Sequence, residues 1–268
     1  MIWLKTLLIK RAMHSFDIDL SEADRPKIDE YHSFNDFFTR SLRAGVRPID
    51  PKVDAIVSPA DGAISQIGTL EADRILQAKG VHYSAAQLLG DTQHAKNYLN
   101  GAFVTVYLSP SNYHRVHIPC EGRLLQTRYI PGELFSVNKL TAQGLPGLFS
   151  RNERLVCEFA SPSIGNFCLI FVGAMLVAGI ETVWGGVESP GQGSMRSQQF
   201  HKHDLYFAKG EELARFKFGS TVIMLFQENR CNWLTTVTAE DEVKVGELIA
   251  TQLNTYAPLD VSPQSLSE

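Results

Sequence analysis

Four side chains in this sequence can carry chemistry together: Asp61, His114, His117 and Ser220. A serine hydroxyl is a weak nucleophile unless a base takes its proton and a third group orients that base. His117 can supply the base and Asp61 the orienting group. The residues therefore predict an activated serine, provided that the fold brings three distant segments together.

The two histidines need a bend in the backbone if both are to serve Ser220. Residues three apart in a regular strand point to opposite faces, so His114 and His117 cannot share a site on a straight strand. The segment 109–112 supplies a turn, and Pro110 favours a short helical segment that ends near His114. A metal site is the less favoured alternative, because three or four ligands are normally needed and no carboxylate or cysteine lies at helical spacing from the pair.

Ser220 begins an apolar run that ends at Phe226, and this run predicts a buried strand. Taken alone, a Gly-Ser-Thr step is most often a turn, because glycine supplies unusual backbone angles and small hydroxyls bond locally. Asp61 has a similar alternative, since Pro-Ala-Asp-Gly is a good type I turn sequence. The segment 201–203, His-Lys-His, is predicted to be a solvated loop. Catalysis is favoured by the combination of these groups and by no single one of them.

Four stretches rich in reactive groups carry a resemblance to a known family: Ser58 to Gly62, Tyr113 to Pro119, Pro131 to Asn138 and Phe218 to Thr221. In this order they strongly resemble the motifs of the phosphatidylserine decarboxylases, self-processing pyruvoyl enzymes that make phosphatidylethanolamine. The resemblance runs from about Tyr31 to about Glu247. The commonest family form has Leu where this chain has Phe218, an apolar-for-apolar change outside the reacting bond.

The resemblance implies a role for each reactive residue. Asp61 orients His117, and His117 takes the proton of Ser220, whose hydroxyl attacks the Gly219 carbonyl in an N-to-O acyl shift. A glycine fits there, because a residue without Cβ allows the strained backbone that the attack needs. Elimination from the ester leaves a dehydroalanine, which hydrolyses to a pyruvoyl group and ammonia. The chain is thereby cut into a large part, 1–219, and a small part, 220–268, which stay together.

The pyruvoyl group made from Ser220 is the covalent cofactor that the resemblance implies. Its carbonyl withdraws the electrons released as carbon dioxide leaves the substrate. His114 is the candidate acid for the proton that replaces carbon dioxide. The segment Pro131 to Asn138 can line the headgroup pocket, with no catalytic role assigned to it.

The composition excludes some other classes of protein. With 44% hydrophobic and 20% charged residues among 268, the chain is typical of a folded globular protein. A formal net charge of −4 argues against a general nucleic-acid-binding protein, which needs a basic face. The four cysteines have no C-x-x-C spacing and are expected to be small apolar side chains in a reducing compartment. The first sixteen residues lack the small-residue cleavage site of a secretory signal.

The segment 1–16 is basic and apolar, with no acidic residue. On a helix, Lys10, Arg11 and His14 share one side, although Lys5 and Leu7 break the separation of faces. The other side carries Leu8, Ile9, Ala12, Met13 and Phe16. Such a helix fits a membrane surface, and the residues fit a helix docked on the domain equally well. The resemblance favours the membrane and implies peripheral attachment to the cytoplasmic face of the inner membrane.

A second helix is predicted after Ser33, which can cap the backbone at Asp36. Its apolar face, with Phe34, Phe37, Phe38 and Leu42, is expected to pack. Beyond residue 48 the pattern changes to short β-rich pieces, with one helix from Ser84 to Leu89. The strand candidates are Val53 to Val57, Ala63 to Ile67, Ala102 to Leu108, Arg123 to Ile130, Leu155 to Phe159, Phe167 to Ala178, Ile180 to Trp184 and Ser220 to Phe226.

These elements predict an α+β fold, a mainly antiparallel β core with N-terminal helices packed on or beside it. We expect an N-terminal helical, membrane-associating region, 1–48, and a β-rich catalytic domain, 49–268. The resemblance implies phosphatidylserine and an anionic membrane surface as partners, and no nucleic acid. The oligomeric state is left open, a homodimer included.

Three other functions remain open from the residues alone. The closest is a pyruvoyl decarboxylase that acts on a soluble amino acid. A second is a serine hydrolase that uses Ser220, His117 and Asp61 on an external ester, although the chain has no G-x-S-x-G elbow. The third is a membrane-associated β module without enzymatic activity.

Overall fold

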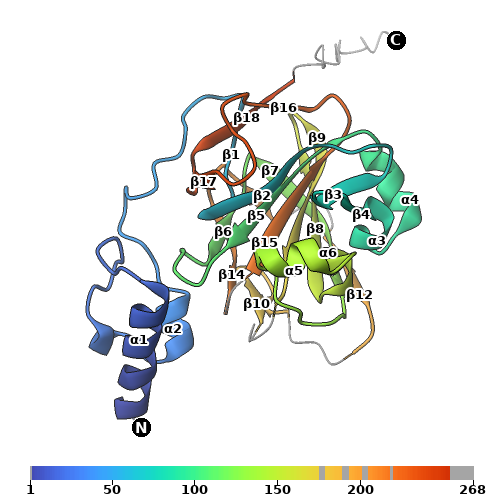
Figure 1. The fold of residues 1–268 in the computed structure, drawn as a ribbon. Coiled ribbons are helices and arrows are strands. Elements are labelled where there is room, and N and C mark those ends of the chain that lie inside the picture. Colours follow the sequence, from blue (N-terminus) through green and yellow to red (C-terminus); the bar gives the residue numbers. More distant parts are fainter. Residues whose placement is uncertain (1, 175–178, 189–192, 201–204, 218–219, 254–268) are drawn as a thin grey trace, which may run out of the picture.

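The computed structural model describes residues 2–174, 179–188, 193–200, 205–217 and 220–253. A group of helices at the N-terminus stands beside a β-rich body, and an extended stretch of chain joins the two (Figure 1). Within the described ranges, every pair of named strands is antiparallel. The predicted α+β fold is confirmed.

The N-terminal region holds a small core of its own. Its helices are α1 (Ile2–Phe16), the 3₁₀ helix η1 (Ile28–Glu30) and α2 (Phe34–Phe38). Helix α1 packs by Ile9 and Ala12, which are buried, while Leu8 is exposed although it was predicted to share their face. The apolar side of α1 is therefore divided between an inward stripe and an outward one.

Helix α2 begins as predicted and ends early. The Ser33 hydroxyl accepts a hydrogen bond from the Asp36 N–H at 3.0 Å, which caps the helix. Phe37 and Phe38 are fully buried, so their predicted packing role is confirmed. Leu42 lies beyond the helix, in an isolated bridge with Ala23.

The main sheet of the body has nine strands in the part of the chain that is described. Strand β15 lies in its middle, hydrogen-bonded to β5 on one side and β9 on the other. The order is β12 (Arg196–Gln199), β7 (Gly122–Ile130), β8 (Arg154–Ser161), β9 (Gly165–Val172), β15 (Ser220–Phe226), β5 (Ala102–Leu108), β2 (Gly62–Thr69) and β17 (Glu242–Val243), and β13 (Tyr206–Phe207) also pairs with β7.

Three smaller sheets complete the β structure of the described residues. One, of β11, β10, β14 and β6, shares a hydrophobic core with the main sheet. Their bounds are β11 (Gly186–Val187), β10 (Ile180–Thr182), β14 (Glu212–Phe216) and β6 (Arg115–His117). The others are β1 (Ala55–Val57) with β18 (Leu248–Gln252) and β16 (Cys231–Trp233), and the hairpin of β3 (Arg74–Ala78) and β4 (Val81–Ser84).

The two faces of the main sheet bury two different cores. Because side chains alternate along a strand, Val222 and Met224 of β15 face one core, and Ile223 faces the other. The first core contains Val116 and Phe216 of the smaller sheet. The second is covered by the helices α3 (Ala85–Leu89), α4 (Thr92–Ala95), η2 (Lys96–Tyr98), α5 (Lys139–Gly144) and α6 (Leu148–Arg151).

Several predicted strands have different ends in the structure. The run from 167 gives β9, which ends at Val172, and residues 175–178 of that prediction lie outside the described residues. The strand predicted from Ile180 ends at Thr182. Among the described residues, no helix is long and apolar enough to cross a membrane.

Candidate active site

A turn between β5 and β6 brings the two histidines into place. The Asn112 N–H donates to the Ser109 carbonyl at 3.0 Å, and the Asn112 side chain accepts from the Ser109 N–H at 2.8 Å. The predicted turn is therefore confirmed. The short helical segment expected after Pro110 is wrong, because these bonds close a tight turn and the chain then enters β6 directly.

His117 is held as a neutral imidazole with a defined tautomer. Its Nδ1 lies 2.8 Å from the Gly210 carbonyl, which can only accept, so Nδ1 carries the proton. Nε2 is then an acceptor, and the Tyr113 hydroxyl lies 3.1 Å from it. Burial lowers the pKa of His117 below its ordinary value. The ring has the charge state of a base, and its basic nitrogen is engaged by Tyr113.

His114 is fully buried beside the N-terminal region. Its Nδ1 donates to the Asn112 carbonyl at 2.8 Å, and its ring centroid lies 4.1 Å from that of Phe38. Nε2 is buried and has no hydrogen-bond partner among the described residues. Burial lowers the pKa of His114 to about 3. Before it can act as an acid at neutral pH, His114 must therefore take up a proton.

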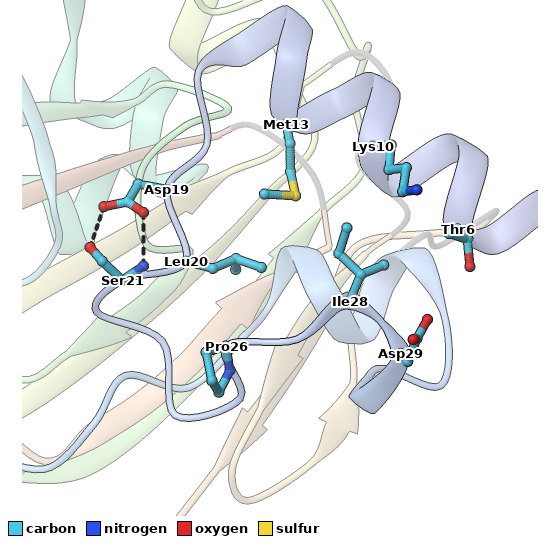
Figure 2. Close-up of a pocket in the computed structure, with 9 residues that line it drawn as sticks. All are labelled: Thr6, Lys10, Met13, Asp19, Leu20, Ser21, Pro26, Ile28 and Asp29. Atoms are coloured by element: carbon cyan, nitrogen blue, oxygen red, sulfur yellow. Dashed lines mark hydrogen bonds between the residues drawn. The ribbon is translucent and has the colours of Figure 1, made fainter.

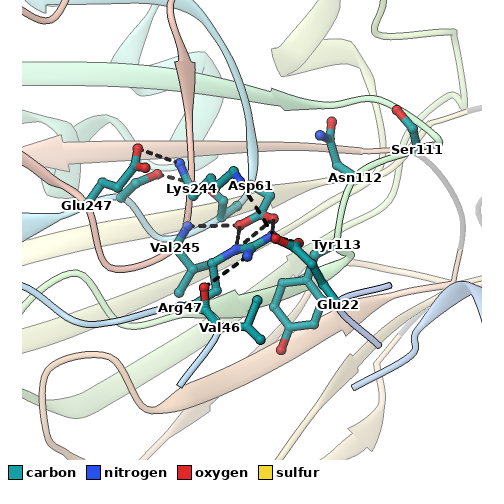
Figure 3. Close-up of polar contacts among 12 residues, drawn as sticks. Glu22, Val46, Arg47, Asp61, Ser111, Asn112, Tyr113, Lys244, Val245 and Glu247 are labelled. Atoms are coloured by element: carbon teal, nitrogen blue, oxygen red, sulfur yellow. Dashed lines mark hydrogen bonds and ion pairs between the residues drawn. The ribbon is translucent and has the colours of Figure 1, made fainter. Parts of the chain in front are cut away.

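Asp61 lies directly before β2, and its carboxylate is occupied by two partners. The Val245 N–H donates to Oδ1 at 2.9 Å. The Arg47 guanidinium donates through Nε to Oδ1 at 2.9 Å and through Nη2 to Oδ2 at 2.5 Å (Figure 3). Gly62 is required next to it, because a Cβ there would meet the Tyr107 carbonyl oxygen of β5 at 2.2 Å. The hydrogen bonds of Asp61 thus go to Arg47 and Val245, and those of His117 go to Tyr113 and Gly210.

Ser220 opens β15 and is fully buried. It faces the same side of the sheet as Val222, toward the core shared with β6 and β14. Its Oγ has no hydrogen-bond partner among the described residues. Phe218 and Gly219, and with them the predicted site of cleavage, lie outside the described residues.

The path of the chain brings Ser220 and His114 into one neighbourhood. The Phe216 N–H, at the end of β14, donates to the His114 carbonyl at 2.9 Å. Ser220 follows Phe216 by four residues, and four residues span at most about 14 Å. The apolar stretch around Ser220 is thus divided between two sheets, since Phe216 belongs to one and Ser220 to the other.

The segment Pro131 to Asn138 is tied down by neighbouring backbone. A Cβ on Gly132 would meet the Arg151 carbonyl oxygen at 2.4 Å, and the Asn152 side chain binds both backbone groups of Phe135. Asn138 caps α5 by accepting from the Thr141 N–H at 2.9 Å. A lining role for this segment in headgroup binding stays a prediction.

Two pockets differ in their relation to Ser220. One of about 630 Å³ lies in the N-terminal region, between α1 and the segment 19–29, with Met13, Leu20 and Ile28 on its wall (Figure 2). The other, of about 540 Å³, is lined by Tyr107 and Val137 among others. Tyr107 pairs with Thr221, so the second pocket borders the strand that Ser220 opens, on the opposite face of the sheet.

Sequence reasoning missed Arg47, Gly210 and Val245 as partners of the predicted relay. Gly210 and Val245 act through backbone groups, which leave no mark in the residue type. Arg47 lies fourteen residues before Asp61 in a chain with 25 basic residues, and no spacing rule relates the two. The segment 201–203, predicted to be a solvated loop, lies outside the described residues.

Comparisons with known proteins place the chain in a family. A buried serine that opens a central strand, with His117 on the facing sheet and His114 just before the strand that carries it, defines a candidate serine-dependent enzyme. A family model described as phosphatidylserine decarboxylase matches residues 34–251. The chain belongs to the phosphatidylserine decarboxylase family, and the family predicted from the four motifs is confirmed.

Individual relatives agree with this assignment, and each is named "Phosphatidylserine decarboxylase proenzyme". The protein of Xylella fastidiosa strain M23 is 48% identical over 252 residues, which cover 94% of this chain and 86% of the relative. That of Methylobacillus flagellatus is 50% identical, covering 84% and 80%. That of Acinetobacter baumannii strain AYE is 50% identical, covering 91% and 84%.

Proposed function

We propose that this chain decarboxylates phosphatidylserine to phosphatidylethanolamine, with a pyruvoyl group that it makes from its own Ser220. Family membership supports the reaction, and the word proenzyme in the names of the relatives supports a precursor that must be processed. The observation that carries the proposal is the Ser220 hydroxyl, which is buried without a partner among the described residues. Buried hydroxyls are normally hydrogen-bonded, so an orphaned one at the predicted cleavage site fits a nucleophile.

In the self-processing step, His117 removes the Ser220 proton. Its Nε2 is unprotonated, and this nitrogen becomes available when the Tyr113 hydroxyl turns away. Asp61 stabilises the imidazolium that forms, as a nearby carboxylate does in a serine relay. The Gly210 carbonyl already holds Nδ1–H, so the ring is oriented before the Ser220 proton moves.

Once formed, the pyruvoyl group would supply an electron sink for the bonding electrons that carbon dioxide leaves behind. His114 handles the accompanying proton. Its unprotonated Nε2 accepts the proton that the substrate ammonium group loses, and it returns that proton to the carbon from which carbon dioxide has left. A neutral histidine with a free nitrogen suits this shuttle better than a permanently charged one.

The two parts of the cut chain remain together because the small part contains the middle strand of the main sheet. Strand β15 pairs with β5 and β9, and both of these belong to the large part. Strand β18 also pairs with β1, and β17 with β2. Separation would expose the apolar side chains of β15 and break its ladders on both sides.

The N-terminal region attaches the enzyme peripherally to an anionic membrane, at the cytoplasmic face of the inner membrane. On α1, Trp3 is 70% exposed and Leu7 is 55% exposed. Lys10 and Arg11 are exposed on the same helix. Exposed apolar side chains beside cations are the combination that binds an anionic bilayer surface.

The first experiment is denaturing mass spectrometry of freshly purified protein beside Ser220→Ala. The expected result is a small chain, 220–268, with a pyruvoyl-blocked end in the wild type, and a single uncut chain in the variant. Carbon dioxide release is then measured with phosphatidylserine vesicles and with free serine. Release from serine alone would favour a decarboxylase of soluble amino acids, and an uncut wild-type chain with esterase activity would favour the serine hydrolase.

A further inference from the structure

Arg47 forms a buried ion pair with the carboxylate that the relay needs. The Arg47 side chain is 11% exposed and that of Asp61 is 7% exposed. On its outer side, Arg47 Nη2 also donates to Glu22 at 2.7 Å, and Lys244 lies 3.8 Å from Glu22 (Figure 3). Arg47 thus links the N-terminal region to Asp61, the residue before β2.

The electrostatics of this pair keep Arg47 charged. Burial alone lowers the pKa of Arg47, but the hydrogen bonds from its guanidinium to Asp61 and Glu22 raise it overall above its ordinary value. The hydrogen bond from Arg47 is also the main cause that lowers the pKa of Glu22. Asp61 therefore faces a permanent cation.

The N-terminal region contacts the histidine side of the site as well. Arg40 Nη2 donates to the Ser111 carbonyl at 3.0 Å, in the turn that leads to His114. Arg115 Nε donates to the Thr39 carbonyl at 2.9 Å. With the Phe38 ring against His114, these contacts place the end of the N-terminal region beside His114 as well as beside Asp61.

We infer that Arg47 is a positioning residue for self-processing, which holds the Asp61 carboxylate in place and so makes the relay depend on docking of the N-terminal region. This inference rests on the proposed self-processing at Ser220. Its physical basis is the cost of an uncompensated buried charge: without Arg47, the carboxylate keeps one hydrogen bond from the described residues, that of the Val245 N–H. It would then turn toward solvent, and it could not stabilise the imidazolium of His117.

The other charged and titratable groups around Asp61 do not replace Arg47. Arg40, His117 and Tyr113 interact with Asp61 electrostatically, without a hydrogen bond to it among the described residues. Lys244 and Glu22 lie on the outer side of Arg47 and pair with each other. Removal of Arg47 therefore leaves the carboxylate without a bonded cation among the described residues.

Three variants test the inference in the full chain: Arg47→Gln, Arg47→Lys and the control Arg25→Gln. Arg25 binds Asp36 at 2.6 Å within the N-terminal region and does not contact Asp61, so its loss removes a comparable ion pair elsewhere. Each chain is made by cell-free translation and transferred to buffers from pH 5 to pH 9. The appearance of the small chain is followed in time, and thermal unfolding is measured for each Ser220→Ala background.

We expect Arg47→Gln to slow processing about tenfold or more, because the carboxylate loses the guanidinium that holds it in place. Arg47→Lys, which keeps a cation, should lie between Arg47→Gln and wild type. Arg25→Gln should process at the wild-type rate within about twofold.

Two results would overturn the inference alone, with the wild-type chain cut normally. One is Arg47→Gln cleaved at the wild-type rate at every pH. The other is a slowing of the same size in Arg47→Lys, with an equal fall in the melting temperature of both Ser220→Ala backgrounds, which would indicate a structural role. An uncut wild-type chain would instead overturn the proposed function and this inference together. If Arg47→Gln fails to fold, the rate of processing of Arg47→Lys decides, against that of Arg25→Gln.

Discussion

Ser220, which opens β15, and Asp61, which lies before β2, are both buried, but their polar groups differ in hydrogen bonding. The Ser220 hydroxyl has no hydrogen-bond partner among the described residues, whereas the Asp61 carboxylate accepts from Arg47 and from the Val245 N–H. A buried hydroxyl without a partner is energetically unfavourable, and a buried carboxylate with a bidentate arginine is not. The proposed nucleophile thus has no hydrogen bond among the described residues, while the carboxylate proposed to assist its base is already held.

In the proposed mechanism, the reacting group, Ser220, is not fixed by a side-chain hydrogen bond among the described residues, whereas the Asp61 carboxylate is fixed before the reaction. His117 combines both features, since its Nδ1–H is held by the Gly210 carbonyl and its Nε2 meets the Tyr113 hydroxyl, which can turn away. The proposed cleavage would then need a small rearrangement around His117 and Ser220, and none at Arg47.

Loss of the Ser220 hydroxyl should have the largest effect. Ser220→Ala should abolish cleavage completely, because no other hydroxyl stands at that position. Thr221→Val is the matched control, since the Thr221 Oγ1 is also buried without a partner among the described residues but faces the other side of the sheet. Denaturing mass spectrometry should show Thr221→Val cut and Ser220→Ala whole. Equal cleavage in both would remove Ser220 as the nucleophile.

Loss of the charge on Asp61 should come next. Asp61→Asn keeps the shape of the side chain but cannot stabilise an imidazolium at His117, and a relay without its carboxylate slows at least about a hundredfold. It also leaves Arg47 buried without its main partner, so the melting temperature should fall. The time course of small-chain formation measures the first effect. A wild-type rate in this variant would show that the Gly210 carbonyl alone suffices to orient His117.

His114→Gln should separate processing from decarboxylation. The variant should still be cut, because His117 and Asp61 are intact. Carbon dioxide release from phosphatidylserine should fall by about a hundredfold or more, the usual loss when a general acid–base group is removed. The comparison is made per mole of small chain, counted by mass spectrometry. An uncut His114→Gln chain would assign His114 to the processing relay instead.

The sequence predicted the centre of this fold better than its edges, for a physical reason. The central strands β5 and β15 have the predicted bounds, Ala102–Leu108 and Ser220–Phe226, because strands buried on both faces are continuous apolar runs. Strand β14 was missed, since Glu212 and Arg215 interrupt its apolar pattern at partly buried positions. Short strands at sheet edges carry too few residues for a pattern.

In the candidate site, the reactive residues could be predicted from the sequence, but their bonding partners could not. Asp61, His117 and Ser220 can be selected from the sequence, because carboxylate, imidazole and hydroxyl side chains are the types that catalysis uses. The partner that each one binds depends on the tertiary fold and often on backbone groups, as with Gly210 and His117. Arg47 is the clearest example of a partner that the sequence could not predict. It belongs to the region predicted to associate with the membrane, and it also binds Asp61 of the proposed relay.

The burial of His114 gives the precursor a measurable pH dependence. Its pKa is about 3 in the folded chain, against 6.5 as the ordinary value, so the unfolded chain binds more protons between these two pH values. The contribution to stability is complete above about pH 6.5 and is lost as the pH falls toward 3. In a Ser220→Ala background, the melting temperature should therefore fall less between pH 7 and pH 5 when His114→Gln is added. An unchanged pH slope would mean that His114 is protonated or accessible in the folded precursor.

Tyr113→Phe should have the smallest effect on cleavage. It tests whether the hydrogen bond to Nε2 of His117 hinders the proposed base. Burial raises the pKa of Tyr113, so its hydroxyl stays protonated and donates to Nε2 of His117. The phenylalanine removes this competing donor and keeps the ring. If Tyr113 merely occupies the basic nitrogen, cleavage should proceed at the wild-type rate or up to about threefold faster, since one neutral hydrogen bond contributes on the order of 1 kcal/mol. A large slowing in the same time course would show instead that the Tyr113 hydroxyl passes the proton between Ser220 and His117, and the base would then act through it.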